Sequence, residues 1–285
     1  MRDTVSGNEI FITSRDGKKI SILYYPSRKE NAPLLVDVHG GGFVSGHHYS
    51  DDRLCSLMNS KLDINVATIE YRYAPEAVYP TATYDCIDAL AEMHRDPNLD
   101  FDKTSVFLMG HSAGANIVAG MSILASCELG IQGQILVYPF LDAAINPRQR
   151  KHIRYSIPAF YMSNFNKKYF PDKPARNEPI ASPVSMTELQ VKRLPPTLLM
   201  TCSFDSLRAD ALKYAELLLK YKIPTRHIEY EGAVHGFVEM VSAGTIESNW
   251  WLGQKRITEQ KRLFVQAIDD ICMFILGRIK EITDI

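Results

Sequence analysis

The sequence predicts an α/β protein with a mostly parallel, eight-stranded sheet that is covered by helices on both faces. Short apolar runs alternate along the chain with segments of helical periodicity, which is the pattern of strands joined by crossover helices. Several of these runs are apolar at every position, as strands buried on both faces are. The 285 residues, 46% of them hydrophobic, are enough for one large domain with a full core.

Each element is expected where its pattern is strongest. The expected strands are residues 10–13, 20–25, 34–38, 66–69, 106–109, 135–138, 197–201 and 226–230. The expected helices are residues 51–61, 81–94, 113–125, 207–221 and 257–279. The turn Arg15-Asp16-Gly17-Lys18 joins the first two strands, so we expect these two to be antiparallel.

Residues 142–193 break the alternation. They are rich in Pro, Asn, Lys and Arg and have no clear period, and a structureless loop of this length is uncommon in a compact domain. We therefore expect an inserted cap or lid, with residues 1–141 and 194–285 as the core. Ten Lys and Arg against four Asp and Glu give the insert +6, which leaves −7 for the rest of a chain of −1. A solvated basic surface is the simpler explanation, and attraction of anionic substrates is the alternative.

Composition argues against several classes of function. A net charge of −1 gives no field that would attract nucleic acid or a membrane surface. No apolar run reaches the roughly 18 residues of a membrane span, and the N-terminal MRDTVSGNEI lacks the apolar stretch of a signal peptide. The five cysteines are scattered, without a C-x-x-C pair, so we expect reduced, mostly buried thiols in a cytoplasmic protein and no metal site.

A serine lies between two glycines in the run Gly110-His111-Ser112-Ala113-Gly114. This fits the nucleophile elbow, a sharp strand-to-helix turn that exposes a serine hydroxyl. A chance match is expected in roughly one chain in ten of this length. Here, however, a strand pattern precedes the motif and a helix of small residues follows it, as the elbow requires. We therefore predict that Ser112 is a nucleophile.

Three glycines follow a second buried strand in His39-Gly40-Gly41-Gly42-Phe43. Successive glycines let the backbone approach a ligand and turn its N–H groups toward it. Acyl transfer needs such donors for the oxyanion of the tetrahedral intermediate. A plain tight turn is the alternative; a phosphate-binding loop is disfavoured because no Gly-Lys-Ser/Thr follows.

An acid and a histidine follow two further strands. Asp205 comes after the strand at 197–201 and His235 after the strand at 226–230. Ligands bind at the carboxyl ends of strands in open α/β sheets, so we expect both side chains near Ser112. His235 would then accept the Ser112 proton while Asp205 orients the imidazole. Taken alone, Asp205 also fits a helix cap and His235 a turn; Asp210 is the rival acid, expected to point away.

These motifs together resemble the hormone-sensitive-lipase-like family of α/β-hydrolase carboxylesterases. The resemblance rests on HGGGF at 39–43, YRYAPE at 71–76 with Tyr79-Pro80 and Asp85, GHSAG at 110–114, Pro195-Pro196, the segment around Asp205 and HGF at 235–237. It implies an α/β-hydrolase fold, an oxyanion hole from the N–H groups of Gly41, Gly42 and Ala113, ester hydrolysis through Ser112, and no cofactor.

The chain departs from the family pattern in three places. His111 stands where Asp or Thr is usual, and Tyr73 where Leu is usual. The first strand begins near residue 10, without the helical cap that often precedes the sheet, which predicts a more open pocket and small acyl groups.

Trp250 and Trp251 are expected to pack under the last helix or at a subunit contact, with an aromatic pocket wall as the alternative.

The sequence thus predicts a serine carboxylesterase for small, soluble esters, with catalytic Ser112, Asp205 and His235. An arylformamidase or amidase on the same triad is the second hypothesis. A non-catalytic binding module on a hydrolase scaffold is the third, and it is disfavoured because the three residues are all present. The expected partner is a small-molecule ester, with no nucleic acid and no membrane, and a homodimer is left open.

Overall fold

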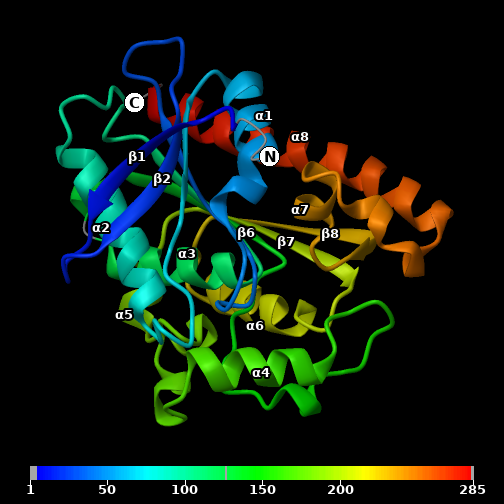
Figure 1. Cartoon of the computed structure of the whole chain (residues 1–285). Helices are drawn as coiled ribbons and strands as arrows, with labels where there is room; N and C mark the ends of the chain where they lie inside the picture. The colour runs from blue at the N-terminus through cyan, green and yellow to red at the C-terminus, as the bar shows by residue number, and fades with distance from the viewer. Residues whose placement is uncertain (1–4, 126, 284–285) are drawn as a thin grey trace.

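The computed structural model of the chain describes residues 5–125 and 127–283 (Figure 1). Its eight strands form one sheet in the order β1-β2-β4-β3-β5-β6-β7-β8. β1 (Asn8–Thr13) pairs antiparallel with β2 (Lys19–Tyr25), and β2 pairs antiparallel with β4 (Asn65–Ile69). The other neighbours are parallel: β3 (Leu34–Val38), β5 (Val106–His111), β6 (Ile131–Val137), β7 (Thr197–Phe204) and β8 (Thr225–Val234). The predicted mixed sheet is confirmed.

Helices cover both faces of the sheet because its strands bury alternate residues on opposite sides. Leu34, Val36 and Val38 of β3 pack on one side with α2 (Thr81–Arg95), α3 (Ala113–Leu124) and α6 (Arg208–Lys220). Leu35 packs on the other side with α1 (Asp52–Leu62), α7 (Phe237–Ser242) and α8 (Gln254–Thr283). All eight predicted strands and five predicted helices are present, each end within four residues of its predicted position.

The insert at 142–193 contains two short helices and several single turns. Figure 1 shows the longer helix, α4 (Ala159–Tyr169), at the side of the molecule away from α8; the shorter is α5 (Glu188–Val191). Met162 and Tyr169 of α4 pack into the same core as α2, α3 and α6. The insert is therefore attached to the core by apolar contacts as well as by its two ends.

Two further expectations concern the cysteines and the membrane. Among the described residues, Cys55, Cys86 and Cys202 are free and buried, and Cys272 is free and partly buried. The side chain of Cys127 lies outside the described part of the chain. A search of the described helices finds none with the length and apolarity of a bilayer span.

Candidate active site

Ser112 occupies the sharp turn between β5 and α3. Its backbone has φ 54° and ψ −113°, a conformation that residues other than glycine rarely adopt. The neighbouring glycines leave room for the turn. A Cβ at Gly110 would lie 2.5 Å from the carbonyl oxygen of Gly114, and one at Gly114 would lie 2.0 Å from that of Val38. The sequence Gly-x-Ser-x-Gly is therefore what lets this backbone raise the serine hydroxyl above the sheet.

The structure brings the three predicted catalytic side chains together. His235, which follows β8, lies with Nε2 2.8 Å from Ser112 Oγ and Nδ1 2.6 Å from Asp205 Oδ2. Ser112 is 9% exposed and Asp205 1%. Three residues from separate loops thus form a continuous Ser–His–Asp chain of hydrogen bonds, which is the geometry of nucleophile activation.

Asp205 has two partners. Its Oδ1 accepts the Leu207 N–H at 3.0 Å while its Oδ2 faces His235, so it closes the turn that leads into α6 and orients the histidine at once. The rival acid Asp210 is buried against Arg150, at 2.5 Å, on another side of α6. As predicted, Asp210 points away from His235.

The electrostatic surroundings of His235 favour its charged form. Burial by itself lowers the pKa of His235, but the Asp205 carboxylate raises it, as does Glu239, and the pKa ends above its ordinary value. Glu239 also links two parts of the site. Its Oε1 accepts the Gly40 N–H at 3.0 Å, and its Oε2 accepts the Tyr138 hydroxyl at 3.1 Å. The tyrosine ring centroid lies 4.9 Å from that of His235.

Glu239 is a residue of the site that was not predicted from the sequence. Its position four residues after His235, one helical turn on, is the only signal that the chain offers for it. The structure shows that it joins the glycine-rich loop to the side of the pocket that carries the histidine.

The glycine-rich loop lies beside Ser112. Gly41 and Gly42 have φ values of 124° and 62°, and a Cβ at Gly41 would lie 1.8 Å from the Ser45 carbonyl oxygen. Side chains are excluded at both positions, so the loop can approach a substrate with its backbone alone. Gly42 and Ala113 line a pocket together with Ser112. The predicted oxyanion-hole residues are thus brought to the predicted nucleophile.

Two pockets of unequal size meet at Ser112. The smaller, about 20 Å³, is lined by Gly42, Phe43, Ser112, Ala113, Phe140, Ile157, Met162, Phe165, Asn166 and Leu207. The larger, about 400 Å³, is open to solvent and is lined by Gly41, Gly42, Ser45, Ser112, Tyr155, Ser156, Ile157, Pro158, Tyr161, Phe165, His235, Glu239, Met240 and Trp251. Residues of the insert, such as Phe165, contribute to both walls.

The expectation that the tryptophans pack under the last helix is wrong, whereas its other form, a subunit contact, stays a prediction for Trp250. Trp250 is 83% exposed and Trp251 44%. Trp251 instead lines the larger pocket and stacks on Tyr155, with ring centroids 5.8 Å apart. The loop before α8 turns toward the insert, which is why the alternative, an aromatic wall, holds for Trp251.

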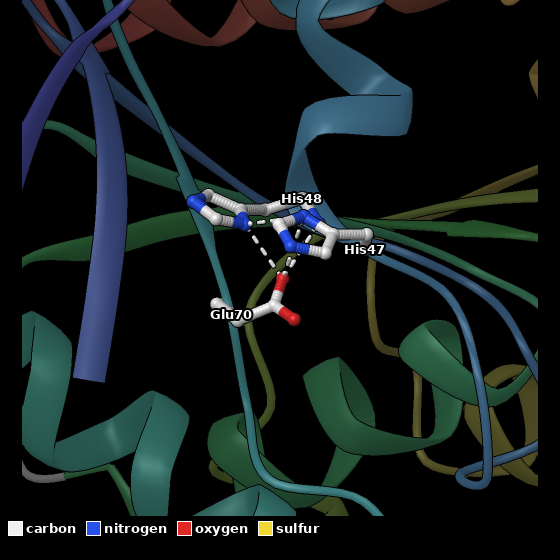
Figure 2. Close-up of side chains that lie close together, drawn as sticks. All are labelled: His47, His48 and Glu70. Atoms are coloured by element: carbon white, nitrogen blue, oxygen red, sulfur yellow. Dashed lines mark hydrogen bonds and ion pairs between the residues drawn. The ribbon is translucent and has the colours of Figure 1, made fainter. Parts of the chain in front are cut away.

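Two groups of three described residues have their potential ligand atoms close enough together to hold a metal ion: His47, His48 and Glu70, and Asp37, Asp51 and His111. The second group is fully buried directly behind the elbow, with His111 Nδ1 3.7 Å from Asp37 Oδ1. Burial raises the pKa of both Asp37 and Asp51, which favours a bound proton there. The first group, which Figure 2 shows, is partly open to solvent.

Comparison with known proteins agrees with this geometry. A family model described as alpha/beta hydrolase fold matches residues 35–239. An arylesterase of Saccharolobus solfataricus is 30% identical over 76% of this chain and 72% of that protein. An ethyl acetate hydrolase of Pseudomonas putida is 28% identical over 82% and 76%. The structure of an esterase from Pyrobaculum calidifontis superposes with a TM-score of 0.80 at 28% identity, over 96% of this chain and 84% of that one.

The chain therefore belongs to the hormone-sensitive-lipase-like α/β-hydrolases. Within this family it is a carboxylic ester hydrolase.

Proposed function

We propose that the enzyme hydrolyses esters of short acyl groups with larger, often aromatic alcohols, through an acyl-enzyme on Ser112. The observation that carries this proposal is the pair of unequal pockets at Ser112, of which the larger has His235 in its lining. The relatives support it, since one is an arylesterase and another an ethyl acetate hydrolase.

The position of His235 supports an assignment of the two halves of the ester to the two pockets. The leaving alcohol takes its proton from the imidazole Nε2, so it must lie on the side of Ser112 that His235 lines. The acyl group then occupies the smaller pocket. A volume of about 20 Å³ there is close to that of one or two water-sized spheres of about 10–15 Å³ each, which suits an acetyl or propionyl group.

The reaction follows from the hydrogen-bonded chain. Ser112 Oγ attacks the ester carbonyl carbon as His235 Nε2 takes its proton. The oxyanion accepts hydrogen bonds from the N–H groups of Gly41, Gly42 and Ala113. Losing one such donor typically costs about 2.7–4 kcal/mol of transition-state stabilisation. His235 then gives the proton to the alcohol oxygen, and a water molecule repeats the sequence on the acyl-enzyme, which releases the acid.

The insert at 142–193 would serve as the cap of this site, since Ile157, Met162 and Phe165 close the smaller pocket. Its positive charge faces elsewhere. No Lys or Arg is among the described residues that line the two pockets, and Glu239 lines the larger one. This supports the simpler explanation of the basic insert as a solvated surface, and a neutral substrate.

Hydrolysis of a p-nitrophenyl ester series from acetate to laurate tests the proposal. We expect kcat/KM to peak between acetate and butyrate. Met162→Ala enlarges the smaller pocket and should move the peak to longer acyl chains. Met240→Ala, the matched control in the larger pocket, should leave the acyl preference unchanged and alter the preference among alcohols. A peak at octanoate or beyond in the wild type contradicts the assignment. Hydrolysis of aryl formamides without hydrolysis of any ester contradicts the ester class itself.

A further inference from the structure

A second cluster of histidine and acid lies outside the two pockets at Ser112. His47 and His48 belong to the loop that leads from the glycine-rich segment into α1, and Glu70 follows β4 directly. Figure 2 shows both imidazole rings facing the Glu70 carboxylate. His48 Nδ1 lies 2.6 Å from Glu70 Oε2, His47 Nδ1 lies 3.4 Å from the same oxygen, and the two nitrogens are 3.1 Å apart.

Hydrogen bonding around His48 shows where its protons are. On the far side of the ring, Nε2 lies 3.1 Å from Ser21 Oγ. The Ser21 hydroxyl has one proton and donates it to Glu9 at 2.7 Å, so in this contact Ser21 is the acceptor and His48 Nε2 carries a hydrogen. Nδ1 is then the ring nitrogen that can serve as a metal ligand, and it is the one that faces Glu70 and His47.

The two other atoms of the cluster also present lone pairs. His47 Nδ1 accepts the backbone N–H of Tyr49 at 3.2 Å, so it bears no hydrogen. Glu70 Oε2 accepts the backbone N–H of His48 at 2.7 Å, which fixes the carboxylate in place. His48 Nδ1, His47 Nδ1 and Glu70 Oε2 therefore lie together as three potential ligand atoms. To bind an ion, His47 Nδ1 exchanges its hydrogen bond with the Tyr49 N–H for the ion.

We propose that His47, His48 and Glu70 bind a divalent transition-metal ion of the zinc type. Two imidazole nitrogens and one carboxylate oxygen are a ligand set that suits Zn²⁺, whereas Mg²⁺ and Ca²⁺ prefer oxygen ligands throughout. Three protein ligands leave a fourth position for water. His48 Nδ1 must be free of a proton to bind the ion, so any proton there is released to solvent when the ion binds.

The distances are close to those a metal ion requires. Ligand atoms about 2.0–2.1 Å from a tetrahedral ion lie about 3.3 Å from one another. The distances from His47 Nδ1 to His48 Nδ1 and to Glu70 Oε2 are 3.1 and 3.4 Å, which is already close to this length. The distance of 2.6 Å between His48 Nδ1 and Glu70 Oε2 is shorter and must widen by about 0.7 Å.

One ring must also turn. The rings of His47 and His48 are stacked, 15° from parallel, so their lone pairs lie in nearly parallel planes. The His48 side chain is 1% exposed and held through Ser21, whereas that of His47 is 45% exposed. His47 is therefore the ligand that rotates onto the ion, and its exposed side is the path by which the ion enters.

Neighbouring side chains hold Glu70 toward the site. The Tyr73 hydroxyl donates to Glu70 Oε1, and it lies 3.4 Å from His39 Nε2, just before the glycine-rich loop. Partners of this kind orient a metal-binding carboxylate.

Zinc titration of the purified full-length chain, stripped with a chelator and dialysed, tests the proposal. Isothermal titration with ZnCl₂ at pH 7.5 should show one equivalent bound. His47→Ala and Glu70→Gln should each weaken binding on the order of 100-fold. Titration with Co²⁺ should give visible d–d bands in the wild type that both substitutions remove. Circular dichroism of each variant checks that it is folded.

His152→Ala is the matched control, because His152 is an exposed histidine of the insert. It should bind zinc as the wild type does. A folded wild type that takes up no zinc would overturn the proposal. Equal zinc affinity in the wild type, His47→Ala and Glu70→Gln would place the bound ion elsewhere and would also overturn it.

Discussion

The molecule contains two sets of serine, histidine and acid with nearly the same internal geometry. The elbow set is Ser112, His235 and Asp205; the strand set is Ser21, His48 and Glu70. In the elbow set the serine lies 2.8 Å and the acid 2.6 Å from the imidazole. In the strand set the two distances are 3.1 and 2.6 Å. Distances alone therefore do not separate a nucleophile from a structural serine.

The surroundings of the two serines differ. Ser112 lies on a strained turn, and its hydroxyl reaches a pocket that Gly42 and Ala113 also line. Ser21 lies within β2, where its carbonyl oxygen accepts the Glu70 N–H at 2.9 Å, and its hydroxyl proton is committed to Glu9. Of the two sets, only the elbow set lies at a cavity that the glycine-rich loop also lines, and acyl transfer requires a cavity with backbone donors at the nucleophile.

The histidines differ as well. His235 has one ring nitrogen toward a hydroxyl and one toward a carboxylate, which is the arrangement of a proton carrier. His48 has a second histidine beside its carboxylate partner, which adds a lone pair. We infer that the group beside the acid separates the two sets. His47 beside Glu70 favours binding of a cation, whereas His235 has no second histidine in its hydrogen-bonded chain and transfers a proton.

Removing the two serines should separate the sets most strongly. Ser112→Ala should lower kcat for p-nitrophenyl acetate by roughly 10⁵–10⁶, because the nucleophile is lost. Ser21→Ala should leave kcat within about twofold of wild type, since this serine is not among the described residues that line the two pockets at Ser112. Steady-state kinetics of both variants, with circular dichroism as the control for folding, checks the pair. A residual rate within tenfold of wild type for Ser112→Ala would rule out Ser112 as the nucleophile.

Replacing the two acids should give the next largest difference. Asp205→Asn keeps the shape but presents an amide to His235 Nδ1, which favours the wrong tautomer, and kcat should fall roughly 10⁴-fold. Glu70→Gln should change kcat by less than about tenfold, because its carboxylate lies outside the pockets. Comparable losses in the two variants would contradict the separation of the sets.

The pH profile tests the charge around His235. The base must be neutral to take the Ser112 proton, so kcat/KM should fall about tenfold per pH unit below its pKa. Because Asp205 and Glu239 raise that pKa, the fall should begin above the range of an ordinary histidine. Glu239→Gln removes one negative charge and should move the acid limb to lower pH. Glu188→Gln, an exposed control, should not; an unmoved limb in Glu239→Gln would exclude its influence.

Sequence reasoning located the elbow set because each of its residues follows a parallel strand. The carboxyl ends of β5, β7 and β8 meet at one edge of the sheet, so Ser112, Asp205 and His235 converge once the strands are assigned. Apolar runs and flanking glycines mark those strand ends plainly. The predicted oxyanion-hole residues reach the same edge for the same reason.

The same reasoning could not predict the strand set. Ser21 meets Glu70 only because β2 pairs antiparallel with β4 in one register, in which Ile22 lies opposite Ile69. The sequence shows both strands but not this pairing. His48 then arrives from a loop whose course depends on tertiary contacts. Trp251 was misplaced for the same reason, because a loop conformation, and not a periodic pattern, decides which side chains it meets.

The smallest expected effect is thermal and depends on the proposed metal site. An ion that binds the folded chain and not the unfolded one stabilises it by about 2.7 kcal/mol at 100 times its dissociation constant. Differential scanning fluorimetry with ZnCl₂ should therefore raise Tm of the wild type and of His152→Ala by several degrees. His47→Ala should show little or no rise, because its remaining two ligands hold the ion too weakly. A full rise in His47→Ala would mean that zinc stabilises the chain through other residues, and the contrast between the two sets would then rest on the elbow set alone.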